Sequence, residues 1–443
     1  MKKSLKTSHR FREQLRQELQ TWQTDGLITS EQSTAINQRY GLDQLAREST
    51  NILLFAIYVI GTVLVAGGII SFVAAHWDKI TPAVKVVLIV SFMLICHASG
   101  IYLWKVSAKS PRLGHALILL GTLIFGANIG LMAQIFHIKS NFYNGLFAWA
   151  VGATIMAYAI ASVPNAVVAV IVSFIGFCFW IEDHPYAFSY YPFIAAVVFI
   201  GFACIYRSVF TFFLALLAVG ISVLTCAVYT GRELTAFILA AIAIAMFYYP
   251  LGLLADRIDR FKSFALPAVS IAVLLIAGTL YFCSFEDIVD EMGPPKAGIW
   301  IIQPASLGAL AVIAWACVFT SVLGSPNKRT SALTLLASTA LLACAMFVQI
   351  YSADQNRLLL GIILTNLACA ILCAGLIANG FIAQDRRPFW AGILFAALII
   401  TSRFLEYETG LLLKAAVFTA CGIALILAGV TFENHLKKRR LAK

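Results

Sequence analysis

Residues 51–75 read NILLFAIYVIGTVLVAGGIISFVAA and contain no charged side chain. A helix needs about 20 apolar residues to cross the hydrocarbon core of a bilayer. Backbone amide and carbonyl groups find no water at that depth, so a helix, which satisfies them internally, is the expected conformation. This stretch therefore predicts a membrane-spanning helix, and runs of the same kind recur along the chain.

The composition of the whole chain agrees with this interpretation. The 443 residues are 61% hydrophobic and only 12% charged, with a mean hydropathy of +0.88. Soluble domains carry about 45–50% apolar and about 25% charged residues. The chain is therefore excluded from ordinary soluble proteins, and we predict an all-α, polytopic transmembrane helix bundle.

Apolar runs between charged residues and prolines predict about fourteen spans. The shortest runs are 190–206 and 389–404, and the break at Pro164 is tight, so the count can fall to thirteen or twelve. The fourteen segments are 51–75, 82–104, 115–136, 145–162, 164–181, 190–206, 208–229, 234–254, 263–285, 300–323, 331–350, 358–380, 389–404 and 411–432.

The placement of basic residues predicts the orientation. Cytoplasmic loops carry an excess of Lys and Arg. With fourteen spans and an inside N-terminus, 24 of the 32 basic residues fall on the inner side. We therefore expect a bacterial inner-membrane protein with both termini in the cytoplasm. This distribution also explains the net charge of +11 without nucleic acid as a partner.

The N-terminal arm has the pattern of two short helices. Apolar residues recur on one face of the first helix, and Gly26 ends that helix. The sequence Thr29-Ser30-Glu31-Gln32 predicts a capping box that opens a second helix, which Gly41 ends. The apolar residues of the first helix are Phe11, Leu15, Leu19 and Trp22.

Three regions follow from these patterns: a cytosolic helical hairpin at 1–50, a transmembrane helix bundle at 51–432 and a basic cytosolic tail at 433–443. The hairpin is too small to bury much apolar surface alone, so a protein partner is one interpretation of it, beside the lipid bilayer. A DNA-reading role is disfavoured, because the second helix carries only Glu31 and Arg39 as charges, whereas phosphate contacts need Lys or Arg.

Three stretches together resemble a known family. They are DGLITSEQ at 25–32 after Trp22, AAHWDKITP at 74–82, and GANIGLMAQIFHI at 126–138 followed by LFAWA at 146–150. In this order they resemble the bacterial membrane proteins of domain of unknown function 2157, over about residues 10–165 and more loosely in the tail. The resemblance implies an inner-membrane location and no assigned activity. His76 and Phe136 depart from the family pattern, in which Asn and Tyr are commoner.

His76 and Asp78 lie in the expected outer link between the first two spans. Trp77 between them suits the headgroup region, and Thr81 and Pro82 suit the start of the next helix. An interfacial anchor is the simpler interpretation. The functional alternative is a polar mouth for a ligand or a proton.

The third span carries small or polar residues at every fourth position. The row Thr122, Gly126, Gly130 and Gln134 is typical of close helix packing. Asn128, Gln134 and His137 add groups that need hydrogen-bond partners at membrane depth. We expect the row at a helix–helix contact, with a neutral polar pocket as the functional alternative.

Charged residues gather where the last two spans meet. Arg403 and Glu406 are one helical turn apart, and Lys414 lies a turn inside the last apolar run. Charges this close to the core are expensive and usually paired. We expect a paired network that fixes the last hairpin, with Glu408 on the connecting turn.

Three classes of function stay open. No motif for a catalytic nucleophile, a metal or a phosphate is present, so we expect no catalytic residue, cofactor or metal ligand. A non-catalytic membrane subunit or scaffold fits best. A carrier for a neutral or lipidic solute is the second interpretation, and a water-filled cavity that reaches mid-membrane would favour it. An intramembrane transferase or hydrolase fits least, because acid–base pairs are lacking.

Overall fold

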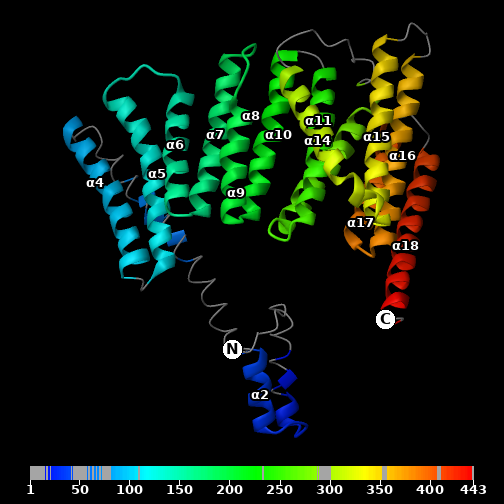
Figure 1. The fold of residues 1–443 in the computed structure, drawn as a ribbon, viewed down its shortest axis with the longest axis horizontal. Coiled ribbons are helices and arrows are strands. Elements are labelled where there is room, and N and C mark those ends of the chain that lie inside the picture. The colour runs from blue at the N-terminus through cyan, green and yellow to red at the C-terminus, as the bar shows by residue number, and fades with distance from the viewer. Residues whose placement is uncertain are drawn as a thin grey trace. The chain divides into compact units, whose positions relative to one another are not determined.

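A computed structural model gives the fold of the chain (Figure 1). It describes residues 15, 18–19, 21–40, 42, 57, 60–61, 64–65, 67–68, 71, 81–107, 110–231, 234–286, 288, 301–351, 357–406 and 411–441. All regular structure in these ranges is helical. The prediction of an all-α fold is therefore confirmed.

The chain divides into two compact units. The first comprises Met1–Asn141 with Val151–Asn165, and the second comprises Phe142–Ala150 with Ala166–Lys443. The division into a hairpin, a bundle and a tail stays a prediction.

The first unit begins with a small hairpin that contains α2 (Ser30–Tyr40). The predicted capping box is present: the Thr29 amide donates to Oε1 of Gln32 at 3.0 Å, and the Gln32 amide donates to Oγ1 of Thr29 at 3.3 Å. Gly26 has φ 72°, the left-handed conformation that ends a helix. Leu19 and Leu42 are buried together and form a small apolar core.

The first unit continues with α4 (Pro82–Ile101), the π-helical turn η2 (Tyr102–Val106) and α5 (Pro111–Ile135). α4 and α5 approach each other closely at two glycines. A Cβ atom on Gly114 would lie 2.7 Å from the carbonyl oxygen of Gly100, and one on Gly100 would lie 2.8 Å from that of Gly114. Only glycine permits this approach, and it fixes the hairpin of the two helices.

The expected contact row on α5 is only partly correct. Thr122 is buried, but Gly130 and Gln134 are exposed, and no atom lies within 4 Å of a Cβ atom built on Gly130. The face of α5 that packs against α4 instead contains Gly114, Ile118 and Gly121, whose spacings of four and three follow the 3.6-residue period of a helix.

The second unit holds most of the described helices. α6 (Phe142–Ala159) begins in the second unit and ends in the first, and α7 (Val163–Asp183) begins in the first unit and continues into the second. The helices that follow are α8 (Tyr191–Ala195), η3 (Ala196–Ile200), α9 (Gly201–Tyr206), α10 (Val209–Gly231), α11 (Leu234–Arg257), η4 (Lys262–Phe264), α12 (Ala265–Phe282), α14 (Ile302–Leu323), α15 (Pro326–Tyr351), α16 (Arg357–Ala383), α17 (Arg386–Glu406) and α18 (Leu411–Leu441).

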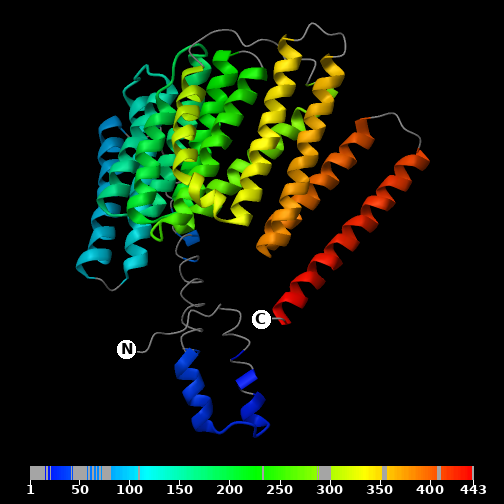
Figure 2. The ribbon, with the colours of Figure 1, turned by 45° about the vertical axis from the view of Figure 1, so that its right-hand side comes forward.

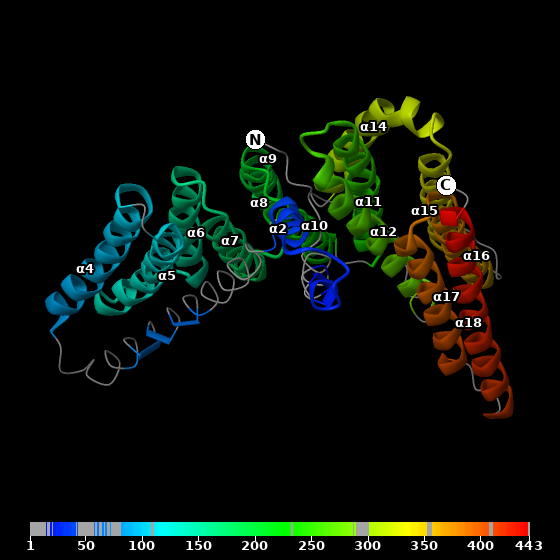
Figure 3. The same ribbon diagram turned by 90° about the horizontal axis from the view of Figure 1, so that it is seen from below.

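The core of the second unit is centred on α11, whose small and aromatic residues are buried against α10, α12 and α14. Tyr248 is fully buried, and its hydroxyl group donates to the carbonyl oxygen of Leu216 at 2.8 Å. Seen from below, α15, α16, α17 and α18 lie side by side at the other edge of this unit (Figure 3).

Ten of the described helices are long and apolar enough to cross a membrane. They coincide with ten of the fourteen predicted spans, so the prediction of a polytopic protein is confirmed. Three more predicted spans are present as helices outside this set: α6, α17 and the shorter apolar helix Tyr191–Tyr206. The predicted span at 51–75 lies largely outside the described residues, and the full count of fourteen stays a prediction.

The described contacts of α18 with α17 lie toward the C-terminal end of α18. The rings of Phe389 and Phe432 stack with centroids 3.9 Å apart, and Arg386 forms two hydrogen bonds of 2.7 Å with Glu433. Little of the apolar length of α18 is buried, and Figure 2 shows it as an outlying helix of this unit. The last helix is therefore held near its C-terminal end.

Candidate functional site

A cavity of about 350 Å³ lies among α11, α12, α15, α16 and α17 in the second unit. It lies at the end of the helices where α11 and α16 finish and where α12, α15 and α17 begin. Its volume is at the lower end of the range of about 300–1,000 Å³ that is typical of small-molecule sites.

The cavity is polar at its mouth and apolar inside. Asp385 and Arg387 lie at the mouth, whereas Leu335 and Leu372 lie deeper. An α-helix rises 1.5 Å per residue, so Leu372 lies about 16 Å from the end of α16 at Ala383. Leu372 is near the middle of that span, and the cavity therefore extends from the helix ends toward mid-membrane.

The local sequence explains why the mouth residues lie where they do. Gln384 has φ 55°, and the Asp385 amide donates to the carbonyl oxygen of Gly380 at 3.2 Å, which ends α16 in a Schellman-type turn. The turn is tight: a Cβ atom on Gly380 would lie 2.8 Å from the backbone nitrogen of Phe389. Oδ1 of Asp385 then accepts from the Arg387 amide at 3.0 Å, which opens α17.

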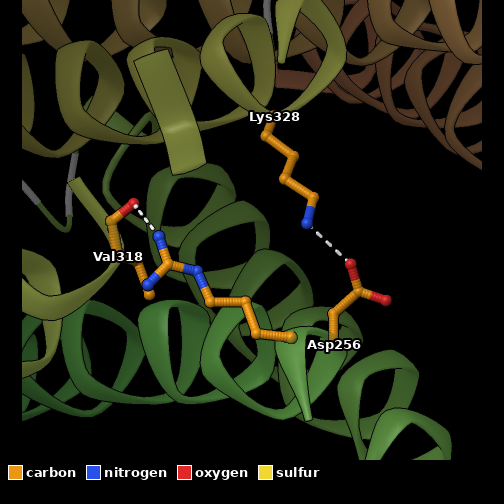
Figure 4. A network of polar contacts seen from close by, with 4 residues as sticks. Asp256, Val318 and Lys328 are labelled. Atoms are coloured by element: carbon orange, nitrogen blue, oxygen red, sulfur yellow. Dashed lines mark hydrogen bonds and ion pairs between the residues drawn. The ribbon is translucent and has the colours of Figure 1, made fainter. Parts of the chain in front are cut away.

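The other cations near the cavity have partners. Nζ of Lys328 lies 2.7 Å from Oδ2 of Asp256, as Figure 4 shows. Arg257 donates to the carbonyl oxygen of Cys317 at 2.6 Å and to that of Val318 at 3.2 Å, which links the end of α11 to α14.

Arg386 also has a partner, because its two hydrogen bonds reach Glu433 on α18. This carboxylate raises the pKa of the Arg386 guanidinium above its ordinary value, first by hydrogen bonding and then by its charge. By contrast, the described residues supply no carboxylate partner to the Arg387 guanidinium.

One side of the cavity is open to the exterior of the helix bundle. Leu266 and Leu274 of α12 line the cavity and are still 51% and 70% exposed. Ala391, on the facing wall of α17, is exposed as well. α12 and α17 flank this opening without extensive contact. In a membrane-spanning bundle such an opening faces lipid.

The opposite wall is rigid. Tyr249 lines the cavity, and its ring stacks on Trp315 with centroids 5.7 Å apart. The indole nitrogen of Trp315 donates to the carbonyl oxygen of Met246 at 3.0 Å. These contacts join α11 to α14 and hold the aromatic wall in place.

At the other end of the same helices, Arg403 joins α17 to the residues that follow α12. Nη2 of Arg403 donates to Oγ of the buried Ser284 at 2.8 Å, and the guanidinium lies 4.4 Å from the ring centre of Phe285. The expected network included Glu406 and Lys414, whose side chains lie outside the described residues, as does Glu408. Arg403 is thus a cross-link between helices, and its pairing with Glu406 stays a prediction.

The structure does not bring the other predicted polar residues into one site. Asn128 is buried, and its Nδ2 lies 3.5 Å from Sδ of Met93, whereas Gln134 is exposed. His137 is exposed with φ 49° and ends α5, where glycine is usual. His76 and Asp78 lie outside the described residues. A neutral polar pocket at the third span stays a hypothesis.

Sequence reasoning missed the residues of the cavity. The signal was the run Asp385-Arg386-Arg387-Pro388 between two spans, interpreted only as an inner loop. Nothing in it separates Arg386, which turns to α18, from Arg387, which lines the cavity. Among the described residues, no group of three or more His, Cys, Asp or Glu side chains is placed to hold a metal ion.

The helices and the cavity define a polytopic helical membrane protein with a cavity that opens on the exterior of its helix bundle. Residues 20–165 match the family model described as a predicted membrane protein (DUF2157), which confirms the resemblance stated from the sequence. No curated protein and no solved structure matches the chain. The matched segment ends before α11, so the family description does not bear on the cavity.

Proposed function

We propose that the protein is a non-catalytic membrane protein that binds an amphipathic solute in this cavity, as a carrier of lipidic molecules does. The observation that carries the proposal is the polarity of the cavity. Its charged lining residues, Asp385 and Arg387, lie at the helix ends, and its apolar lining reaches the middle of α16. A molecule with a polar head and an apolar tail matches this order.

The lining favours binding over chemistry. Asp385 is the sole carboxylate among the described lining residues, and no histidine or cysteine accompanies it. General acid–base catalysis needs a positioned proton donor and acceptor at the reacting atoms. The scaffold interpretation rests on the N-terminal hairpin, where Leu27 is exposed. The cavity is the more specific feature of the two.

The proposal places the protein in a bacterial inner membrane with both termini in the cytoplasm. The position of 24 of the 32 basic residues on one side supports this orientation. The mouth of the cavity lies at the end that carries Lys328, Arg386 and Arg387, and therefore in the cytoplasmic leaflet.

Filling the cavity tests the proposal. Ser270→Phe on α12 and Ala391→Phe on α17 place a ring in the cavity from opposite walls. Leu398→Phe is the matched control, because it lies on the same face of α17 two turns further on, exposed and outside the cavity. Native mass spectrometry of the protein purified in mild detergent would count the bound lipid.

We expect the wild type and Leu398→Phe to retain a bound amphiphile, and both cavity variants to lose at least nine-tenths of it. Equal retention by all four proteins would overturn the proposal.

A further inference from the structure

Building on the proposed function, we infer that the ligand is a phospholipid with an amine-bearing, zwitterionic headgroup. Its phosphate binds Arg387, its ammonium group binds Asp385, and one acyl chain enters the cavity between α12 and α17. The lateral opening, the cavity volume and the charges at the mouth each support one part of this assignment.

The charge pattern selects the phosphate site. Lys328 and Arg386 are neighbours of the mouth, and each has a carboxylate at 2.7 Å. Arg387 lines the cavity, is exposed, and has no carboxylate partner among the described residues. A guanidinium matches the geometry of a phosphate through two parallel N–H donors. Among the described residues that line the cavity, Arg387 is therefore the cation that is available to a ligand.

Asp385 indicates that the lipid headgroup carries an amine. Its Oδ1 accepts the Arg387 amide, and no described residue donates to Oδ2. A purely anionic headgroup would bring a second negative charge to this carboxylate, which is unfavourable. An ammonium group on the same headgroup removes the conflict, because it pairs with Asp385 while the phosphate pairs with Arg387.

A third polar group lies close by. Oδ1 of Asn379 is buried and accepts no hydrogen bond from the described residues, and Asn379 lines the same cavity. A buried acceptor without a donor is costly. The ammonium group of a bound lipid would donate the hydrogen bond that Oδ1 of Asn379 needs.

The volume selects a single chain. A cavity of about 350 Å³ is at the small end of ligand sites and is too small for a whole two-chain lipid. The open side at Leu266 and Leu274 lets the second chain stay in the bilayer. The contact of Arg403 with Ser284 joins α17 to the residues that follow α12, at the end away from the mouth.

Binding of defined lipids to the full-length protein tests the assignment. The purified, delipidated protein would be titrated with phosphatidylethanolamine and with phosphatidylglycerol of the same acyl chains, and Kd values would be read by native mass spectrometry. We expect the amine lipid to bind at least tenfold more tightly. Arg387→Gln should weaken both lipids at least tenfold, and Arg387→Lys should restore part of the loss.

Asp385→Asn should weaken only phosphatidylethanolamine and bring the ratio of the two Kd values close to one. Arg386→Gln is the matched control: it removes an adjacent guanidinium whose partner is Glu433, and should leave both Kd values unchanged. An equal effect of Arg386→Gln and Arg387→Gln would show general attraction to the basic end and overturn the assignment.

The failures of the two proposals are distinguishable. If Ala391→Phe abolishes binding but Asp385→Asn leaves the preference unchanged, the cavity binds an amphiphile and the headgroup assignment is wrong. Tighter binding of phosphatidylglycerol by the wild type would also refute it. If Ala391→Phe binds both lipids like the wild type, the proposed function itself fails.

Discussion

Replacing Gly114 by alanine tests the close contact between α4 and α5. The added Cβ atom would lie 2.7 Å from the Gly100 carbonyl oxygen, 2.7 Å from Cβ of Trp104 and 2.8 Å from its backbone nitrogen. Two of these are backbone atoms, so no side-chain rotation relieves the overlap and the helices must separate. Overpacking of this kind costs about 1–3 kcal/mol.

Gly130→Ala is the matched control on the same helix. Its Cβ atom would meet nothing within 4 Å, so the substitution changes only the intrinsic helix propensity. Alanine is favoured over glycine there by about 0.8–1.0 kcal/mol. The gain in helix propensity is the same in both variants and cancels when their unfolding free energies are compared. We therefore expect Gly114→Ala to be less stable than Gly130→Ala by about 1–3 kcal/mol.

Reversible unfolding in mixed detergent micelles, followed by tryptophan fluorescence, would measure this difference. Gly100→Ala should behave like Gly114→Ala, and the double variant should lose less than the sum, because the first substitution already separates the helices. Equal stability of Gly114→Ala and Gly130→Ala would refute the contact. If the losses of unfolding free energy add fully in the double variant, the two glycines do not act at the same contact between α4 and α5.

Three further outcomes are expected. A reporter that is active only in the cytoplasm should be active when fused at Thr50 and when fused at Lys443. Activity of a periplasm-only reporter at either site would contradict the orientation. A double-mutant cycle with Asp256→Asn and Lys328→Met should give a coupling of about 0.2–1 kcal/mol, because the pair is partly exposed; zero coupling would remove it as a link between α11 and α15. Arg403→Gln should couple to Ser284→Ala by about 0.6–1.7 kcal/mol in unfolding free energy, and strict additivity would disprove the cross-link.

The helices themselves follow from local sequence. Each of the ten candidate spans is a continuous apolar run, and the condition that backbone groups bond internally acts on every such run independently. The capping box at Thr29 and Gln32 is likewise local, because its two hydrogen bonds join residues three apart. These features were predicted correctly for that reason.

Features that depend on which helices meet were predicted less well. The row through Gly130 has the right spacing for a contact, but spacing alone does not say which face of α5 meets α4. The contact of Arg403 with Ser284, which is 119 residues distant, was not predicted from the sequence, and the pairing of Arg403 with Glu406 stays a prediction.

The cavity lay beyond sequence reasoning for the same reason. It needs five helices whose lining residues range from Tyr249 to Ala391, and no single stretch carries its pattern.

The shape of α18 has a mechanical consequence. Its 31 residues form one continuous helix of about 46 Å, longer than the hydrocarbon core of about 30 Å. The ring stack of Phe432 on Phe389 and the pairing of Glu433 with Arg386 fasten this rod to the first turn of α17. The helix continues past that point to Leu441, so a force applied to the C-terminal end of α18 would be transmitted through these two contacts to α17. Attraction of the basic C-terminal residues to an anionic membrane surface would therefore act first on the turn between α16 and α17, which contains Asp385 and Arg387.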